Sequence, residues 1–76
     1  MERKHKRMIK KYGAYICVKA LLLNEGRGQG SRTIAFDLGY QENTVVAMLD
    51  TASAIREHDE ELFYNLVEQI EDEGLR

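Results

Sequence analysis

Residues 31–50 read SRTIAFDLGYQENTVVAMLD, and this stretch carries the clearest structural signal in the chain. Apolar residues recur at helical spacing on both sides of Gly39: Ile34, Ala35 and Leu38 before it, and Val45, Met48 and Leu49 after it. Glycine readily adopts the left-handed backbone that ends a helix and turns the chain. The stretch therefore predicts two helices joined by a tight turn.

The stretch begins with Ser31, which comes directly before the first predicted helical residue, Arg32. A serine there predicts an N-cap that accepts a hydrogen bond from the amides of the first turn. Counted from Ser31, the apolar, small and glycine residues follow the order found in helix-turn-helix DNA-binding proteins: Ile34, Ala35, Leu38, Gly39, Tyr40, Val45 and Met48. The chain resembles that superfamily over about a quarter of its length.

The resemblance implies that the second helix, from about Glu42 to His58, enters the major groove of double-stranded DNA. Its first turns present polar and small side chains, of which Gln41, Asn43 and Ala47 are expected to read base edges. Ser31, Arg32 and Thr44 are expected to bond phosphates and set the register. Further cations for the DNA backbone are predicted at three positions: Arg27, Lys6 and Lys10.

The charge of this predicted recognition helix argues against DNA binding. It has no Lys or Arg before Arg56, while Glu42 and Asp50 would both repel phosphate. Because phosphate neutralisation supplies most nonspecific affinity, the cations must come from elsewhere in the chain.

Composition limits the fold to one small all-α domain of four or five helices. The chain has 76 residues, 43% of them hydrophobic, and no proline. A domain of this size buries only about 60% of its unfolded surface. With Cys17 as the one cysteine, an intrachain disulfide is excluded, so self-association is the expected source of further burial.

The chain is basic at its start. A helix is predicted over residues 2–23, weakened by Gly13, and a glycine-rich loop over residues 24–30. Residues 1–38 carry a charge of +6 and residues 39–76 a charge of −8. The basic cluster near Lys6 and Lys10 has three interpretations: an arm that binds phosphate, a solvated face, or an intramolecular partner of the acidic C-terminus. His5, among like charges, is expected to be solvated.

A final acidic helix is predicted over residues 59–73, with Asp59 as its N-cap and Gly74 with Leu75 as its C-terminal cap. One broad apolar stripe runs along it. The stripe could pack within one chain or against a second copy across a two-fold axis. We expect at least part of it to lie in a homodimer interface formed by Leu62, Phe63, Leu66, Val67 and Ile70.

Other functional classes find no support in the sequence. His58 beside Asp59 does not form an acid-base pair, no nucleophile has a recognisable setting, and the loop at 24–30 lacks the Lys-Ser/Thr pair of a phosphate-binding loop. We therefore expect no enzymatic activity, no cofactor and no metal site. The most apolar run, residues 14–23, is too short to cross a bilayer, so a cytoplasmic protein without membrane contact is expected.

The sequence thus favours a small, sequence-specific transcriptional regulator that binds double-stranded DNA, similar to the short regulators of phages and mobile elements. The alternative is a protein-interaction module or inhibitor that binds a host protein or a nucleic-acid-handling complex. Its support is the acidic second half and the uncharged Val46 and Ala47, which suit a protein groove as well as a thymine methyl group.

Overall fold

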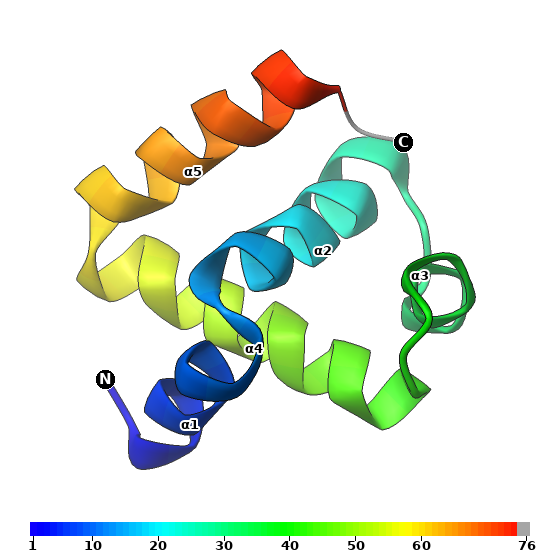
Figure 1. Cartoon of the computed structure of the whole chain (residues 1–76), viewed down its shortest axis with the longest axis horizontal. Helices are drawn as coiled ribbons and strands as arrows, with labels where there is room; N and C mark the ends of the chain where they lie inside the picture. Colours follow the sequence, from blue (N-terminus) through cyan, green and yellow to red (C-terminus); the bar gives the residue numbers. More distant parts are fainter. Residues whose placement is uncertain (75–76) are drawn as a thin grey trace.

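Two helices form the centre of the fold and three others pack around them (Figure 1). The computed structural model describes residues 1–74, which contain no strand. The helices are α1 (Arg3–Tyr12), α2 (Ala14–Arg27), α3 (Ser31–Leu38), α4 (Glu42–His58) and α5 (Glu60–Glu73). Helices α2 and α4 contact each other and all the rest, whereas α1, α3 and α5 do not contact one another. The prediction of an all-α fold with four or five helices is confirmed.

The predicted helix over residues 2–23 is broken in two at Gly13. This glycine has φ 94° and ψ 150°, a backbone conformation that is nearly exclusive to glycine. Helix α2 then continues past Leu23 to Arg27 and ends where Gly28 adopts the left-handed conformation. The prediction of one continuous helix was wrong because Gly13 redirects the chain instead of only weakening the helix.

The turn between α3 and α4 forms at Gly39, as the sequence predicts. Gly39 has φ 79°, and the amides of Gly39 and Tyr40 both donate to the carbonyl oxygen of Ala35 at 2.9 Å. The predicted N-cap of α3 was wrong: Gly30 occupies that position and Ser31 is the first helical residue. The Ser31 hydroxyl instead donates to Glu42 Oε2 at 3.0 Å, which ties the start of α3 to the start of α4.

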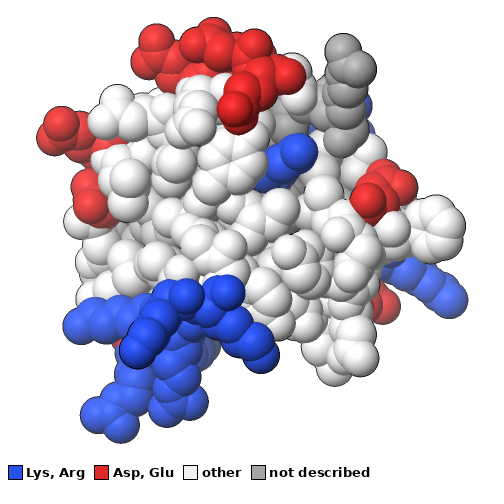
Figure 2. Space-filling view, in the orientation of Figure 1, with Lys and Arg blue, Asp and Glu red and all other residues white. Residues whose placement is uncertain are grey.

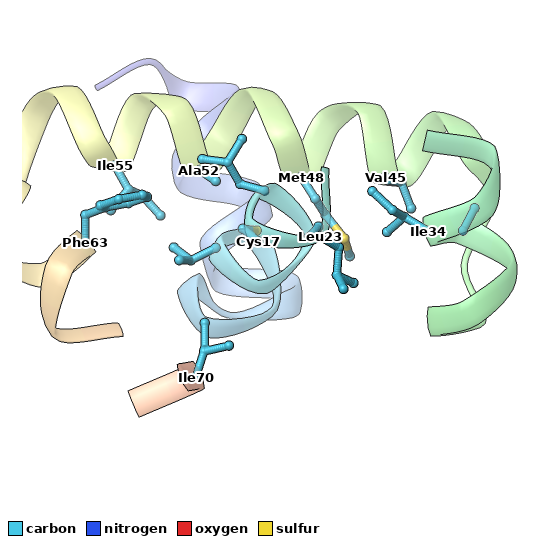
Figure 3. Packing of buried hydrophobic residues seen from close by; sticks show 13 residues of the cluster. Cys17, Leu23, Ile34, Val45, Met48, Ala52, Ile55, Phe63 and Ile70 are labelled. Carbon is cyan, nitrogen blue, oxygen red and sulfur yellow. The ribbon is translucent and has the colours of Figure 1, made fainter. Parts of the chain in front are cut away.

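The core lies between α2, α3, α4 and α5 (Figure 3). Ile34 of α3 and Val45 of α4 point toward one another, and Ile55 of α4 lies against Phe63 of α5. Cys17 is fully buried in α2, and this burial raises the pKa of its thiol to about 11. Helix α1 contributes only partly buried apolar residues at the edge of the core: Met8, Ile9 and Tyr12.

Helix α5 begins where the sequence predicts, since Asp59 Oδ1 accepts a hydrogen bond from the Leu62 amide at 3.2 Å. It ends at Glu73, followed by Gly74 with φ 83°; Leu75, the second residue of the predicted cap, lies outside the described residues. The Tyr15 hydroxyl donates to Glu73, which links α2 to the end of α5.

The apolar stripe of α5 faces the core of its own chain. Phe63 is 4% exposed and Ile70 is fully buried, so both are core residues and the prediction that they contact a second copy was wrong. Leu66 and Val67 are partly buried against the same core, and Leu62 is exposed. The stripe packs inside because α5 lies across both α2 and α4, which together cover most of its apolar side.

We expect Gly13→Ala to destabilise the protein by about 1–3 kcal/mol, because alanine is strained in the backbone conformation of Gly13 although no atom would block its Cβ. The matched control is Gly26→Ala inside α2, where the Cβ also meets open space. That change is expected to stabilise the protein by about 0.5–1 kcal/mol, because alanine favours a helix more than glycine. Urea unfolding of both variants checks this. Equal effects of the two changes would contradict the account of the α1–α2 break.

Candidate nucleic-acid interface

The N-terminal half of α4 has one buried side and one exposed side. Val45 and Met48 are fully buried, whereas Gln41, Asn43 and Val46 are exposed, Val46 by 52%. These three side chains are uncharged, whereas the exposed Glu42 and Asp50 carry negative charge on the same half of the helix. Two of the three, Gln41 and Asn43, carry carboxamides that both donate and accept hydrogen bonds.

Helix α1 packs against α4, with contacts to Asp50 near the middle of that helix and to Tyr40 just before its start. Near the start of α1, His5 Nε2 lies 2.8 Å from Asp50 Oδ2, and Lys4 Nζ lies 3.4 Å from the same oxygen. At its end, the Tyr12 ring packs edge-on against the Tyr40 ring, with centroids 5.5 Å apart. These contacts join the basic helix to the middle of α4 and to the turn that precedes α4.

His5 is not solvated, contrary to the prediction, because it is only 6% exposed and forms the main polar contact between α1 and α4. The other ring nitrogen of His5, Nδ1, is buried without a hydrogen-bond partner among the described residues. The hydrogen bond from His5, followed by that from Lys4, holds the pKa of Asp50 below its ordinary value. No local pattern predicts this contact, because the two residues lie 45 positions apart.

The charges of the chain separate in space as well as in sequence. The cations of α1 gather at one end of the molecule, and carboxylates cover α5 at the opposite end (Figure 2). Because α1 and α5 do not contact each other, the basic helix is not an intramolecular partner of the acidic C-terminal helix. Its cations remain on the surface beside α4: Arg3, Lys4, Lys6, Arg7, Lys10 and Lys11.

The predicted site residues fall into groups on different elements. Gln41 and Asn43 are exposed at the start of α4, whereas Thr44 and Ala47 are half-buried. Lys6 and Lys10 are exposed on α1.

The remaining predicted phosphate contacts lie near the start of α3. Arg27, at the end of α2, and Arg32, in α3, are exposed, and Ser31 is half-buried with its only hydroxyl proton donated to Glu42. Helices α1 and α3 both contact α4 but not each other. The predicted cations therefore belong to three separate helices, α1, α2 and α3, all of which pack on α4.

We expect His5→Ala to raise the pKa of Asp50 toward the ordinary aspartate value of about 3.9. Lys4→Ala should raise it less, since the His5 hydrogen bond is the largest cause of the lowered value. A carboxylate with a lowered pKa stabilises the folded state above its unfolded-state pKa, and this contribution is lost as pH falls through the folded-state pKa. The pKa of Asp50 in each variant is measured from its carboxyl ¹³C chemical shift across pH 2–6. An ordinary pKa in the unaltered protein would contradict the contact.

Other kinds of site have no basis in the part of the chain that the structure describes. Residues 1–74 contain no cluster of three or more His, Cys, Asp or Glu side chains that could hold a metal ion. None of the described helices combines the length and apolarity that a membrane crossing requires.

Comparison with family models, with curated proteins and with solved structures finds no significant match for this chain.

Proposed function

We propose that this protein binds double-stranded DNA as a small transcriptional regulator, through a surface formed by two helices. We name it the α1–α4 surface. It consists of the exposed cations of α1 and of the exposed neutral residues at the start of α4: Arg3, Lys4, Lys6, Arg7, Lys10, Lys11, Gln41, Asn43 and Val46. The observation that carries the proposal is that α1 contacts Asp50 in the middle of α4 and Tyr40 before its first turn, so that its cations flank the half of α4 that the helix-turn-helix resemblance assigns to the major groove.

The packing of α1 on α4 brings positive charge to a recognition helix that has no Lys or Arg before Arg56. A recognition helix without cations needs a neighbouring source of positive charge, and α1 supplies six Lys and Arg side chains beside it. The same helix offsets one of the two repulsive carboxylates, because Asp50 is paired with Lys4 and bonded to His5.

The other carboxylate, Glu42, is also held within the chain. It accepts a hydrogen bond from Ser31 and lies in the first turn of α4, where a negative charge interacts favourably with the helix dipole. The phosphate contacts of the proposed complex therefore come mainly from α1, with Arg32 of α3 as a further candidate. Ser31 is left out, since its hydroxyl donor is used by Glu42.

A salt titration tests the proposal. Fluorescence anisotropy with a labelled duplex should show tight binding at ~50 mM salt and a steep fall as salt is added. If the α1 cations neutralise four to six phosphates, log K plotted against log salt should have a slope of about −4 to −5. No binding at the lowest salt, where electrostatic attraction is strongest, would overturn the proposal.

One observation favours the alternative function of a protein-interaction module. Phe36 on α3 is 88% exposed, and aromatic side chains are enriched at the centres of protein interfaces. Such a module would bind a host protein through α3. Phe36→Ser should then abolish co-purification of a defined partner while leaving duplex affinity unchanged, and retention of the partner by this variant would exclude the alternative.

A further inference from the structure

The first turns of α4 expose neutral side chains, and the two exposed carboxylates near them are both engaged by other residues of the chain. Between residues 41 and 55 only Glu42 and Asp50 are charged. Glu42 Oε2 accepts a hydrogen bond from the Ser31 hydroxyl at 3.0 Å. Asp50 Oδ2 lies 2.8 Å from His5 Nε2 and 3.4 Å from the Lys4 ammonium group.

The next cation along α4 is also engaged. Arg56 donates to both carboxylate oxygens of Glu25, at 2.8 and 3.3 Å, and its guanidinium group lies 5.6 Å from the Phe63 ring centroid. These contacts hold Arg56 toward α2 and α5. The exposed side chains at the start of α4 that remain for a partner are therefore neutral. We call Gln41, Asn43 and Val46 the neutral row.

The chemistry of the neutral row matches one kind of base pair. In the major groove, guanine is read chiefly by Arg or Lys and cytosine by a carboxylate, whereas Asn or Gln pairs with adenine and an apolar group contacts the thymine methyl. We propose that the α1–α4 surface reads A·T base pairs in the major groove, with the Asn43 or Gln41 carboxamide on adenine and Val46 on the thymine methyl group. This inference rests on the proposed function and adds the class of DNA sequence that it recognises.

The spacing of the row suits neighbouring base pairs. Residues three positions apart on a helix, such as Asn43 and Val46, have Cβ atoms about 5–6 Å apart on one face. Successive base pairs are about 3.4 Å apart along the duplex axis. The two side chains therefore reach base pairs one or two steps apart, which corresponds to a short A·T tract.

Duplexes with identical length and flanks test the inference, because they share the same number of phosphates. Their central blocks contain A·T, G·C or inosine·cytosine pairs, and affinities are compared at one salt concentration. The A·T duplex should bind roughly 5- to 150-fold more tightly than the G·C duplex for each base pair contacted. Asn43→Ala should reduce this ratio, and Asn65→Ala on the exposed face of α5 is a matched control that should leave it unchanged.

The inosine duplex identifies the groove. Inosine·cytosine presents the major-groove groups of G·C and the minor-groove groups of A·T, so it should bind as weakly as the G·C duplex. Replacement of thymine by uracil removes only the methyl group and should weaken binding by the unaltered protein. Val46→Ser should no longer distinguish thymine from uracil.

The outcomes separate this inference from the proposed function. If no duplex binds, the proposed function fails and the inference fails with it. If the A·T and G·C duplexes bind equally, DNA binding stands and the A·T preference is wrong. If the inosine duplex binds as tightly as the A·T duplex, the preference arises in the minor groove, and the assignment to the neutral row of α4 is overturned.

Discussion

Replacing Lys6 and Lys10 together with glutamine is expected to weaken duplex binding by roughly 10- to 100-fold at ~0.1 M salt. The two lysines lie four residues apart on α1, so their side chains share one side of that helix. If each neutralises one phosphate, the slope of log K against log salt should become shallower by about 1.8. The loss should be the same for A·T and G·C duplexes, because phosphate contacts carry no base information.

The control for this change is the same substitution at a lysine outside the α1–α4 surface. Lys19→Gln removes one cation from α2, outside the α1–α4 surface, and is compared with Lys6→Gln and Lys10→Gln singly. Circular dichroism should show unchanged folding of all three variants. A loss of affinity with Lys19→Gln as large as with Lys6→Gln would mean that net charge, and not the position of α1, governs binding.

Ile55→Ala is expected to destabilise the protein by about 2–5 kcal/mol. Ile55 is fully buried in α4 and lies against Phe63 of α5, so its truncation leaves a cavity where two helices meet (Figure 3). At roughly 0.05–0.15 kcal/mol per residue, a chain of 76 residues has a total stability of only about 4–11 kcal/mol. The variant should therefore be partly unfolded or melt at least ~8 °C lower.

The matched control for the core change lies on the same helix. Val46→Ala also shortens an aliphatic side chain of α4, but at a position that is 52% exposed. Its effect on stability should remain within about 0.5 kcal/mol, as for most surface substitutions. Thermal melts of both variants measure the difference, and a fall in melting temperature as large for Val46→Ala as for Ile55→Ala would contradict the assignment of the two sides of α4.

Local signals in the sequence predicted the features that depend on neighbouring residues. Gly39 predicted the turn between α3 and α4, and Asp59 predicted the start of α5, because turn and cap chemistry act within a few positions. The same kind of reasoning failed at Ser31. Serine and glycine both occur at N-caps, and Gly30 takes the position while Ser31 bonds to Glu42, which no pattern around Ser31 contains.

Features that depend on distant packing were not predictable from the sequence. The pairing of His5 with Asp50 joins residues 45 positions apart and is one of the contacts that hold the basic helix against α4. The apolar stripe of α5 predicted burial, but the sequence does not distinguish burial in the same chain from burial in a dimer. The break at Gly13 is a related case, since helix propensity alone indicates a weakened helix and does not specify the positive φ that Gly13 adopts.

The most direct measurement of the central claim is an ¹⁵N-HSQC titration of the labelled protein with an unlabelled duplex at ~50 mM salt. We expect the amide signals of Lys6, Lys10, Asn43 and Val46 to shift together, because they belong to one surface, while those of Leu62 to Ile70 in α5 stay in place. Shifts confined to α3 or α5, or α1 shifts without any change at Asn43 and Val46, would contradict the claim that α1 and α4 bind DNA as a single surface.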